Sequence, residues 1–343
     1  MDDSIIRSDS GSLYGVPFKK PELIHISILY SIAVALFLFL PPVLRPLKLN
    51  FYISGGFSEL ILVLLPAILL LLYCGYDIKN VLRLNKVGFI NMLLTFWIMV
   101  LAIPAVGVLN VINMWLVKLI FGSTDNINIP VATDWVALLL GILVIGGSAG
   151  ICEEIMFRGV IQRGFERFGA AGSIIITAIL FGLLHRDMQR LFGTAALGAL
   201  IGFLVYRSDS IFTGMFAHFT NNSIAVLMGY LSYKLQQLSH SQTNAAKNQG
   251  TEQMQMIIAT VFLGMLVIGA TAGFIALLYA YIKNTSDKVV KVRREKIPHK
   301  GKGLVWLAPG LGMIAFIFLV QGLELRGAGF GILTWIVKFL GLG

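Results

Sequence analysis

The sequence predicts an all-α, polytopic integral membrane protein, a bundle of helices with about eight to ten membrane segments. Hydrophobic residues make up 57% of the 343 residues and charged residues only 13%, whereas soluble domains carry about 25% charged residues. Long apolar runs recur along the chain without the alternation of a lipid-facing strand. Lipid admits only helices and closed barrels, and the missing alternation excludes the barrel.

Nine apolar runs are long enough, or nearly so, to cross a bilayer. They lie at about 24–44, 58–75, 88–108, 134–157, 170–185, 191–206, 211–230, 255–282 and 304–323. A tenth run, at about 329–342, is short and flanked by glycines, which indicates a re-entrant or interfacial helix. The run at 109–121 contains Asn110, Asn113 and Lys118, so we expect an amphipathic extension rather than another span.

The basic residues predict the orientation of the chain. If each of the nine runs crosses once, eighteen Lys and Arg lie on the side of the N-terminus and seven on the other side. Cytoplasmic loops carry this excess, so we expect a cytoplasmic N-terminus, with the plasma membrane as the location. The net charge of +10 then reflects membrane orientation, and no nucleic-acid partner is expected.

Three regions follow from these runs. Residues 1–133 form the N-terminal membrane helices, and residues 134–230 form a core that contains the polar motifs described next. Residues 231–343 contain a polar stretch at 231–254, expected to be a flexible external loop, and C-terminal helices joined by a basic cytoplasmic loop at 283–302.

Two adjacent glutamates, Glu153 and Glu154, are the only charges between Trp135 and Phe157. A carboxylate at membrane depth is costly and normally marks function. Glu154 and Arg158 are four residues apart, so they share a helix face and form an ion pair. Glu153 points about 100° away and has no partner in its own turn, which leaves it as a general base. The alternative is a buried ion network that only holds helices together.

Histidines follow in two later runs. His185 ends the segment Phe181-Gly182-Leu183-Leu184-His185, and His218 lies four residues before Asn222. On a helix His218 and Asn222 project to one side, where both can donate to a developing oxyanion. Hydrogen bonding between helices is the alternative use of such side chains in a membrane.

The ordered motifs Glu-Glu-x-x-x-Arg, Phe-x-x-x-His and His-x-x-x-Asn, at 153–158, 181–185 and 218–222, resemble those of the CPBP family. This family comprises CAAX proteases and bacteriocin-processing intramembrane proteases and is also called ABI. The resemblance covers roughly 134–230, including the flank Phe157-Arg158-Gly159. It implies an eight-helix core, peptide-bond hydrolysis, and a peptide or protein substrate within the lipid bilayer.

The resemblance also implies roles for single residues. Glu153 and His185 would activate water, and His218 and Asn222 would stabilise the oxyanion. Apart from the resemblance, Glu154 and Arg158 are expected to orient the first of these helices, and Phe181 is expected to have a structural role beside the site.

Several alternatives stay open. Zinc held by Glu153, His185 and His218 would make the protein a metalloprotease, but the chain lacks a His-Glu-x-x-His motif, so no cofactor is expected. A non-catalytic immunity or scaffold protein and a proton-coupled transporter are the other candidates. The sequence shows no repeat symmetry of the transporter kind. Nothing in it distinguishes a prenylated peptide, a bacteriocin leader or a membrane regulator as substrate.

Overall fold

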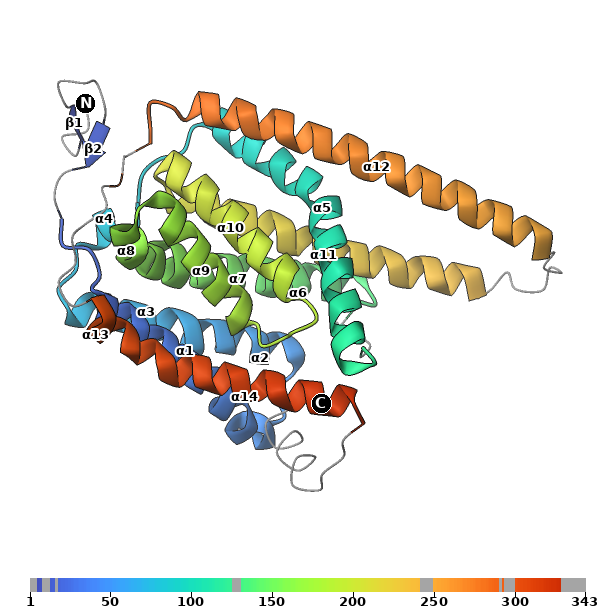
Figure 1. The fold of residues 1–343 in the computed structure, drawn as a ribbon, viewed down its shortest axis with the longest axis horizontal. Helices are drawn as coiled ribbons and strands as arrows, with labels where there is room; N and C mark the ends of the chain where they lie inside the picture. Colours follow the sequence, from blue (N-terminus) through green and yellow to red (C-terminus); the bar gives the residue numbers. More distant parts are fainter. Residues whose placement is uncertain are drawn as a thin grey trace.

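A computed structural model describes residues 5–7, 13–15, 18–124, 131–240, 249–289, 292 and 300–327. The described chain is helical (Figure 1), except for two short antiparallel strands near the N-terminus, β1 (Ile5–Arg7) and β2 (Leu13–Gly15). The predicted all-α membrane bundle is therefore confirmed.

The N-terminal region contributes three long helical stretches. α1 (Leu23–Leu44) continues into the 3₁₀ turn η1 (Arg45–Leu47). α2 (Phe51–Ser58), the π-helical turn η2 (Glu59–Leu64) and α3 (Leu65–Tyr73) form one continuous span. The short α4 (Ile78–Val81) precedes α5 (Phe89–Phe121). Since α5 is a single helix, the expectation that 109–121 extends the preceding span is confirmed.

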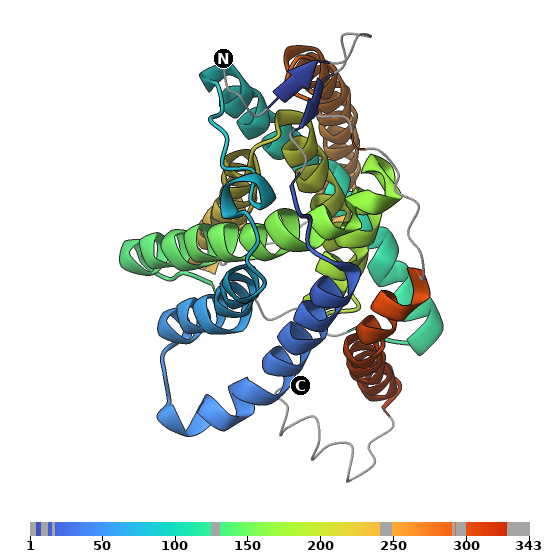
Figure 2. The ribbon, with the colours of Figure 1, turned by 90° about the vertical axis from the view of Figure 1, so that its left-hand side faces the viewer.

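The core region begins with one bent helical rod. It comprises α6 (Trp135–Gly141), η3 (Ile142–Ser148), α7 (Ala149–Glu154), η4 (Ile155–Ile161), α8 (Gln162–Phe165) and η5 (Glu166–Phe168), of which η3 and η4 are π-helical and η5 is 3₁₀. α9 (Ala170–Leu184), α10 (Leu191–Ser208) and α11 (Ile211–His240) follow. The rod, green in Figure 2, extends across the molecule.

The C-terminal region contains α12 (Gln249–Asn284), α13 (Lys300–Leu304), the 3₁₀ turn η6 (Val305–Leu307) and α14 (Ala308–Leu325). The prediction of a loop over 231–254 was wrong at both ends, because α11 and α12 extend into it. Its Gln, Lys and Leu residues are good helix formers, so an existing helix continues through them. Most of the basic loop at 283–302 and the run at 329–342 lie outside the described residues.

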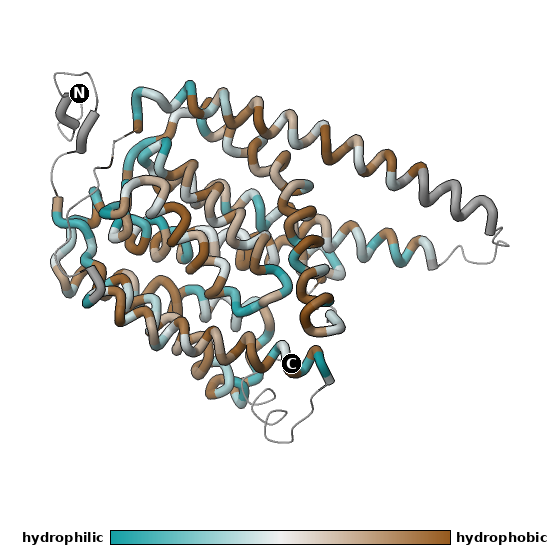
Figure 3. The backbone as a smooth tube through the Cα atoms, in the orientation of Figure 1, coloured by the Kyte–Doolittle hydropathy of each residue, from teal (hydrophilic) through white to brown (hydrophobic). Residues whose placement is uncertain are grey.

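Each of the nine predicted runs coincides with a helix. Among the described residues, seven helices are long and apolar enough to cross a membrane, and α9 is apolar but shorter, at 15 residues. α11 is not among the seven, because His218, Asn221 and Asn222 lower its hydropathy. Large apolar side chains are exposed on many helices, and hydrophobic residues recur along the helices in Figure 3. In the most apolar stretch of α12, which packs along α5, no residue is buried. Such a surface fits lipid as solvent.

Glycines bring the rod into close contact with α11. A Cβ added to Gly150 would lie 3.2 Å from the Met215 carbonyl oxygen and 3.3 Å from the Phe219 amide nitrogen. One added to Gly146, a turn earlier, would lie 2.7 Å from Ser223 Oγ. Small residues four apart let helix backbones approach in membranes, and here they place α7 directly against α11.

A buried ion cluster fixes the end of the rod that follows the motifs. Arg83 pairs with Glu166 and, through Nε, with Asp209 Oδ1 at 2.9 Å. Arg163 Nη1 lies 3.3 Å from Glu166 Oε1, and Arg163 also donates to the carbonyls of the 80–81 turn. Two cations and two carboxylates compensate one another, as buried charges require. The cluster joins the segment after α4 to the α10–α11 junction.

Candidate active site

The two glutamates lie on α7, a short α-helical stretch between the π-helical turns η3 and η4. α7 packs against η2 on one side and α11 on another. π turns within helices occur frequently at functional sites. Here α7 is the short α-helical segment between the two π-helical turns, and it places both carboxylates in the interior of the bundle.

Glu154 is bound by two other side chains. Arg158 Nη1 donates to Glu154 Oε1 at 2.8 Å, and both side chains are fully buried. The same oxygen accepts from His218 Nδ1 at 2.9 Å. The pair expected from the four-residue spacing is therefore present. The hydrogen bond from His218 on α11 was not predicted, because it depends on how two helices pack.

Arg158 is held in turn by its surroundings. Its Nη2 donates to the Gly198 carbonyl at 3.0 Å, and its guanidinium lies 4.5 Å from the centre of the Phe181 ring. The cation–π contact and the hydrogen bonds together fix a desolvated charge. Phe181 therefore supports the site, where the second motif had predicted it.

Gly214 of α11 leaves room for the Glu154 carboxylate. A Cβ at this position would lie 2.6 Å from Glu154 Oε2, a contact that real side chains do not make. Any larger residue would displace the carboxylate or separate α11 from α7. This glycine thus contributes to the geometry of the site without contributing a functional group.

Glu153 retains an unused oxygen. Its side chain is 12% exposed, and its Oε2 atom is buried without a hydrogen-bond partner among the described residues. That oxygen lies 3.9 Å from His218 Nε2, which is longer than a hydrogen bond. Glu154 Oε2 also lacks a hydrogen-bond partner there, but Glu154 is tied to Arg158 and His218 through Oε1, so Glu153 is the glutamate that no hydrogen bond holds within the described chain.

His218 connects the two carboxylates. A carboxylate that is already paired with Arg158 only accepts, so His218 Nδ1 donates to Glu154. This hydrogen bond fixes the orientation of the imidazole ring and directs Nε2 toward Glu153. His218 is therefore positioned by one glutamate and directed at the other.

His185 lies at the edge of this arrangement. It caps the C-terminal end of α9 and is exposed, and its Nδ1 contacts the Phe181 carbonyl oxygen at 2.9 Å. Its ring lies 4.8 Å from the Phe181 ring, which also contacts His218 at 5.9 Å between centroids. Within the described chain no hydrogen bond or ion pair joins His185 to either glutamate, so the structure places it near the site through Phe181 alone.

The Asn222 side chain faces the rod and does not face His218. Its Nδ2 donates to the Ile145 carbonyl in the π-helical turn η3 at 2.8 Å, and its Oδ1 accepts from Asn221 Nδ2 at 3.0 Å. An amide nitrogen carries two N–H groups, so one donor is left after this contact. Asn221, to which the sequence assigned no role, holds the amide in this orientation.

Glu59 is a further carboxylate near the site, and the sequence motifs did not predict it. It opens the π-helical turn η2, which packs against α7, and its Oε2 atom is buried without a hydrogen-bond partner in the described part of the chain. It lies within electrostatic reach of Glu153. The signal was available, because Glu59 is the only charge in the apolar run at 58–75.

Glutamate and histidine side chains can also bind zinc. The described residues contain no group of three or more His, Cys, Asp or Glu side chains that could hold a metal ion. Glu153, His185 and His218 are thus not gathered into such a group in this structure. Cys74 and Cys152 are both free thiols.

The fold and this site define a polytopic helical membrane protein with a buried carboxylate–histidine centre. Residues 134–224 match the sequence model of a family described as "Type II CAAX prenyl endopeptidase Rce1-like". The match contains all three motifs. The resemblance to the CPBP family is thus confirmed for the part of the chain that carries them.

A curated relative agrees with this family. The chain is 28% identical over 147 residues to the Bacillus subtilis (strain 168) protein named "Putative membrane peptidase YdiL". The matched residues are 42% of this chain and 56% of that protein, so the similarity covers little more than half of the relative. No solved structure matches the chain.

The structural role of Glu154 gives a testable prediction. Glu154→Gln leaves the fully buried Arg158 without its carboxylate partner, and breaking a buried pair in this way costs about 3–5 kcal/mol. Glu153→Gln is the matched control, because it alters a carboxylate oxygen that has no hydrogen-bond partner. Thermal unfolding of the purified proteins in detergent should show a much lower midpoint for Glu154→Gln. Equal midpoints would contradict the assignment.

Proposed function

We propose that this protein is an intramembrane endopeptidase that hydrolyses a peptide bond through water activated by a glutamate. The observation that carries the proposal is the difference between the contacts of the two adjacent carboxylates. Glu154 accepts hydrogen bonds from Arg158 and His218 through Oε1, while the Glu153 side chain makes no hydrogen bond among the described residues and places Oε2 3.9 Å from His218 Nε2. The family match and the name of the Bacillus relative support the same class of reaction.

In the proposed reaction Glu153 takes a proton from water as the water oxygen bonds to the carbonyl carbon of the scissile amide. The carbonyl oxygen becomes an oxyanion. His218, in its imidazolium form, donates to it from Nε2, and the second N–H of Asn222 adds a further donor. Glu153 then returns its proton to the amide nitrogen as the carbon–nitrogen bond breaks, which regenerates the carboxylate.

Glu154 is proposed as a positioning residue. It orients His218 through Nδ1, in the way that a buried carboxylate orients the base of a hydrolytic triad. Arg158 balances its charge, so the pair stays fixed when charge develops nearby. This arrangement explains why two adjacent glutamates are useful: one fixes the histidine and the other acts on water.

His185 and Glu59 lie around this centre. We assign His185 to water activation with Glu153, as the second motif implies, and its position beside Phe181 is compatible with approach to the reacting water. Glu59 lies within electrostatic reach of Glu153, and its Oε2, like Glu153 Oε2, is buried without a hydrogen-bond partner among the described residues. Both oxygens are acceptors that a water molecule could bind.

The substrate is proposed to be a peptide or protein segment in the membrane. The description of the matched family makes a lipid-modified C-terminal peptide the first class to test, before a bacteriocin leader or a membrane regulator. The plasma membrane and a cytoplasmic N-terminus remain predictions from the basic loops.

Glu153→Gln should abolish proteolysis while the protein stays folded, because the amide keeps the volume but cannot accept the proton. The measurement is quantitative mass spectrometry of peptide termini in membranes of cells that make either form. Glu22→Gln, which alters a half-exposed carboxylate outside the site, is the control. Termini generated by wild type and by Glu22→Gln should be absent with Glu153→Gln. Identical sets would instead favour a non-catalytic scaffold or a transporter.

We further propose that no metal takes part, because every motif residue has a role without one. Activity should therefore survive dialysis against a strong chelator. The measurement is the cleavage rate before and after dialysis, together with elemental analysis of the active protein. Stoichiometric zinc, with activity lost on its removal and restored on its readdition, would overturn this proposal.

A further inference from the structure

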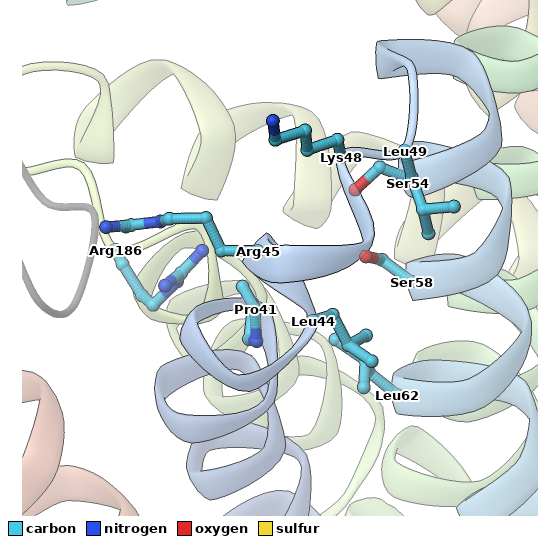
Figure 4. Close-up of a pocket in the computed structure, with 9 residues that line it drawn as sticks. All are labelled: Pro41, Leu44, Arg45, Lys48, Leu49, Ser54, Ser58, Leu62 and Arg186. Carbon is cyan, nitrogen blue, oxygen red and sulfur yellow. The ribbon is translucent and has the colours of Figure 1, made fainter.

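A second polar site lies away from the glutamates, in a cavity of about 430 Å³ between the end of α1 and the α2–η2 helix (Figure 4). Nine residues line it, and none of them is acidic: Pro41, Leu44, Arg45, Lys48, Leu49, Ser54, Ser58, Leu62 and Arg186. Three cations and two hydroxyls thus border one small space. The mechanism proposed above uses none of them.

The cations reach this cavity from two separate turns. Arg45 and Lys48 belong to the turn after α1, whereas Arg186 follows the C-terminal end of α9. Figure 4 shows the side chains of Arg45 and Arg186 on one side and the hydroxyls of Ser54 and Ser58 on the facing helix. Cations gathered around one cavity repel each other, and an anion between them removes that repulsion.

Arg186 is held in place for such a role. Its Nη1 donates to the Phe37 carbonyl at 3.0 Å, its guanidinium lies 5.4 Å from the Phe37 ring, and its own carbonyl accepts from Gln321 at 2.7 Å. Its Nε is buried without a hydrogen-bond partner among the described residues. One anchored donor therefore has no acceptor in the described part of the chain.

The backbone is also unusual at two of these cations. Lys48 and Arg186 have φ angles of +47° and +55°, in the left-handed region that residues other than glycine seldom adopt. Such conformations persist where the surroundings impose them. Here they occur on both sides of the cavity.

The cavity lies at the turn between two helices that are long and apolar enough to cross a membrane, Leu23–Leu47 and Phe51–Tyr73. A turn between two crossing helices, such as the one with Arg45 and Lys48, lies at the level of the lipid head groups. Exposed apolar side chains border the same turn, among them Val43, Leu47 and Ile53. These side chains suit contact with acyl chains, and the cations suit a phosphate above them.

We propose that this cavity binds the phosphate of an anionic phospholipid. Arg45 and Arg186 would hold the phosphate oxygens, a geometry that guanidinium groups fit well. Lys48, Ser54 and Ser58 would donate to the remaining oxygens, and Leu44 and Leu49 would contact the glycerol end. Basic pockets between membrane helices bind lipid head groups in this way. Since Arg186 directly follows His185, the lipid would also hold the end of α9 beside the active site.

The test is native mass spectrometry of the purified protein, titrated with dihexanoyl-phosphatidylglycerol, dihexanoyl-phosphatidylcholine or inorganic phosphate. Phosphatidylglycerol should bind most tightly. Arg45→Gln/Arg186→Gln should weaken its binding by about tenfold or more for each lost charge-assisted hydrogen bond. Arg45→Lys/Arg186→Lys, which keeps the charge, should retain most of the binding.

A control double variant removes equal charge elsewhere. Lys118 is an exposed residue of α5, and Arg190 pairs with Asp187 in the same turn as Arg186, yet neither lines the cavity. Lys118→Gln/Arg190→Gln should bind phosphatidylglycerol like wild type.

Three results would overturn the proposal. The first is equal binding of phosphatidylcholine and phosphatidylglycerol, and the second is binding of phosphatidylglycerol by the Gln double variant at the wild-type level. The third is inorganic phosphate that binds as tightly as phosphatidylglycerol, which would show that the ligand is free phosphate and not a lipid. Loss of phosphate binding in the Gln double variant would still support a phosphate site in this cavity. The unfolding midpoint of each variant without lipid shows whether it is folded.

Discussion

One oxygen of Glu154 accepts hydrogen bonds from Arg158 on its own helix and from His218 on α11. The remainder of the site depends on this atom, because it neutralises the buried guanidinium and orients the imidazole at the same time. Without it, His218 Nε2 would not be directed at Glu153, and Arg158 would be a desolvated charge without compensation. The adjacent glutamates therefore differ in their contacts, because only Glu154 bonds to both Arg158 and His218.

This contact requires two helices to approach more closely than ordinary side chains permit. Gly146 and Gly150 on the rod, and Gly214 on α11, remove the atoms that would keep them apart. π-helical turns also lie on both sides of α7. Asn222 donates a hydrogen bond to the Ile145 carbonyl in one of them. Packing in lipid favours such small residues, since apolar burial alone does not drive helices together there.

The sequence predicted what depends on local spacing. The nine apolar runs, the single long helix through 109–121 and the Glu154–Arg158 pair all follow from residues near one another in the chain, and the structure contains them. The sequence could not predict contacts between helices. The hydrogen bond from His218 to Glu154, the turn of Asn222 toward Ile145 and the approach of Glu59 to Glu153 each depend on how separate helices pack.

An external loop was predicted over 231–254, but much of this stretch is helical. Polar composition over 231–254 predicted a loop, but α11 and α12 continue into it, because polarity determines solvent exposure more directly than it determines backbone conformation. The roles of His185 and Asn222 also rest on the motif more than on contacts. His185 reaches the centre only through Phe181, and one N–H of Asn222 is already used.

The central claim is that Glu153 and His218 act as one unit on the same reacting water and carbonyl. A double-mutant cycle of Glu153→Asp and His218→Gln on the single-turnover cleavage rate tests it most directly. Residues that act as a unit are strongly non-additive. We predict that the double variant is scarcely slower than the slower single variant. A loss equal to the product of the two single losses would contradict the claim and place the two residues in separate steps.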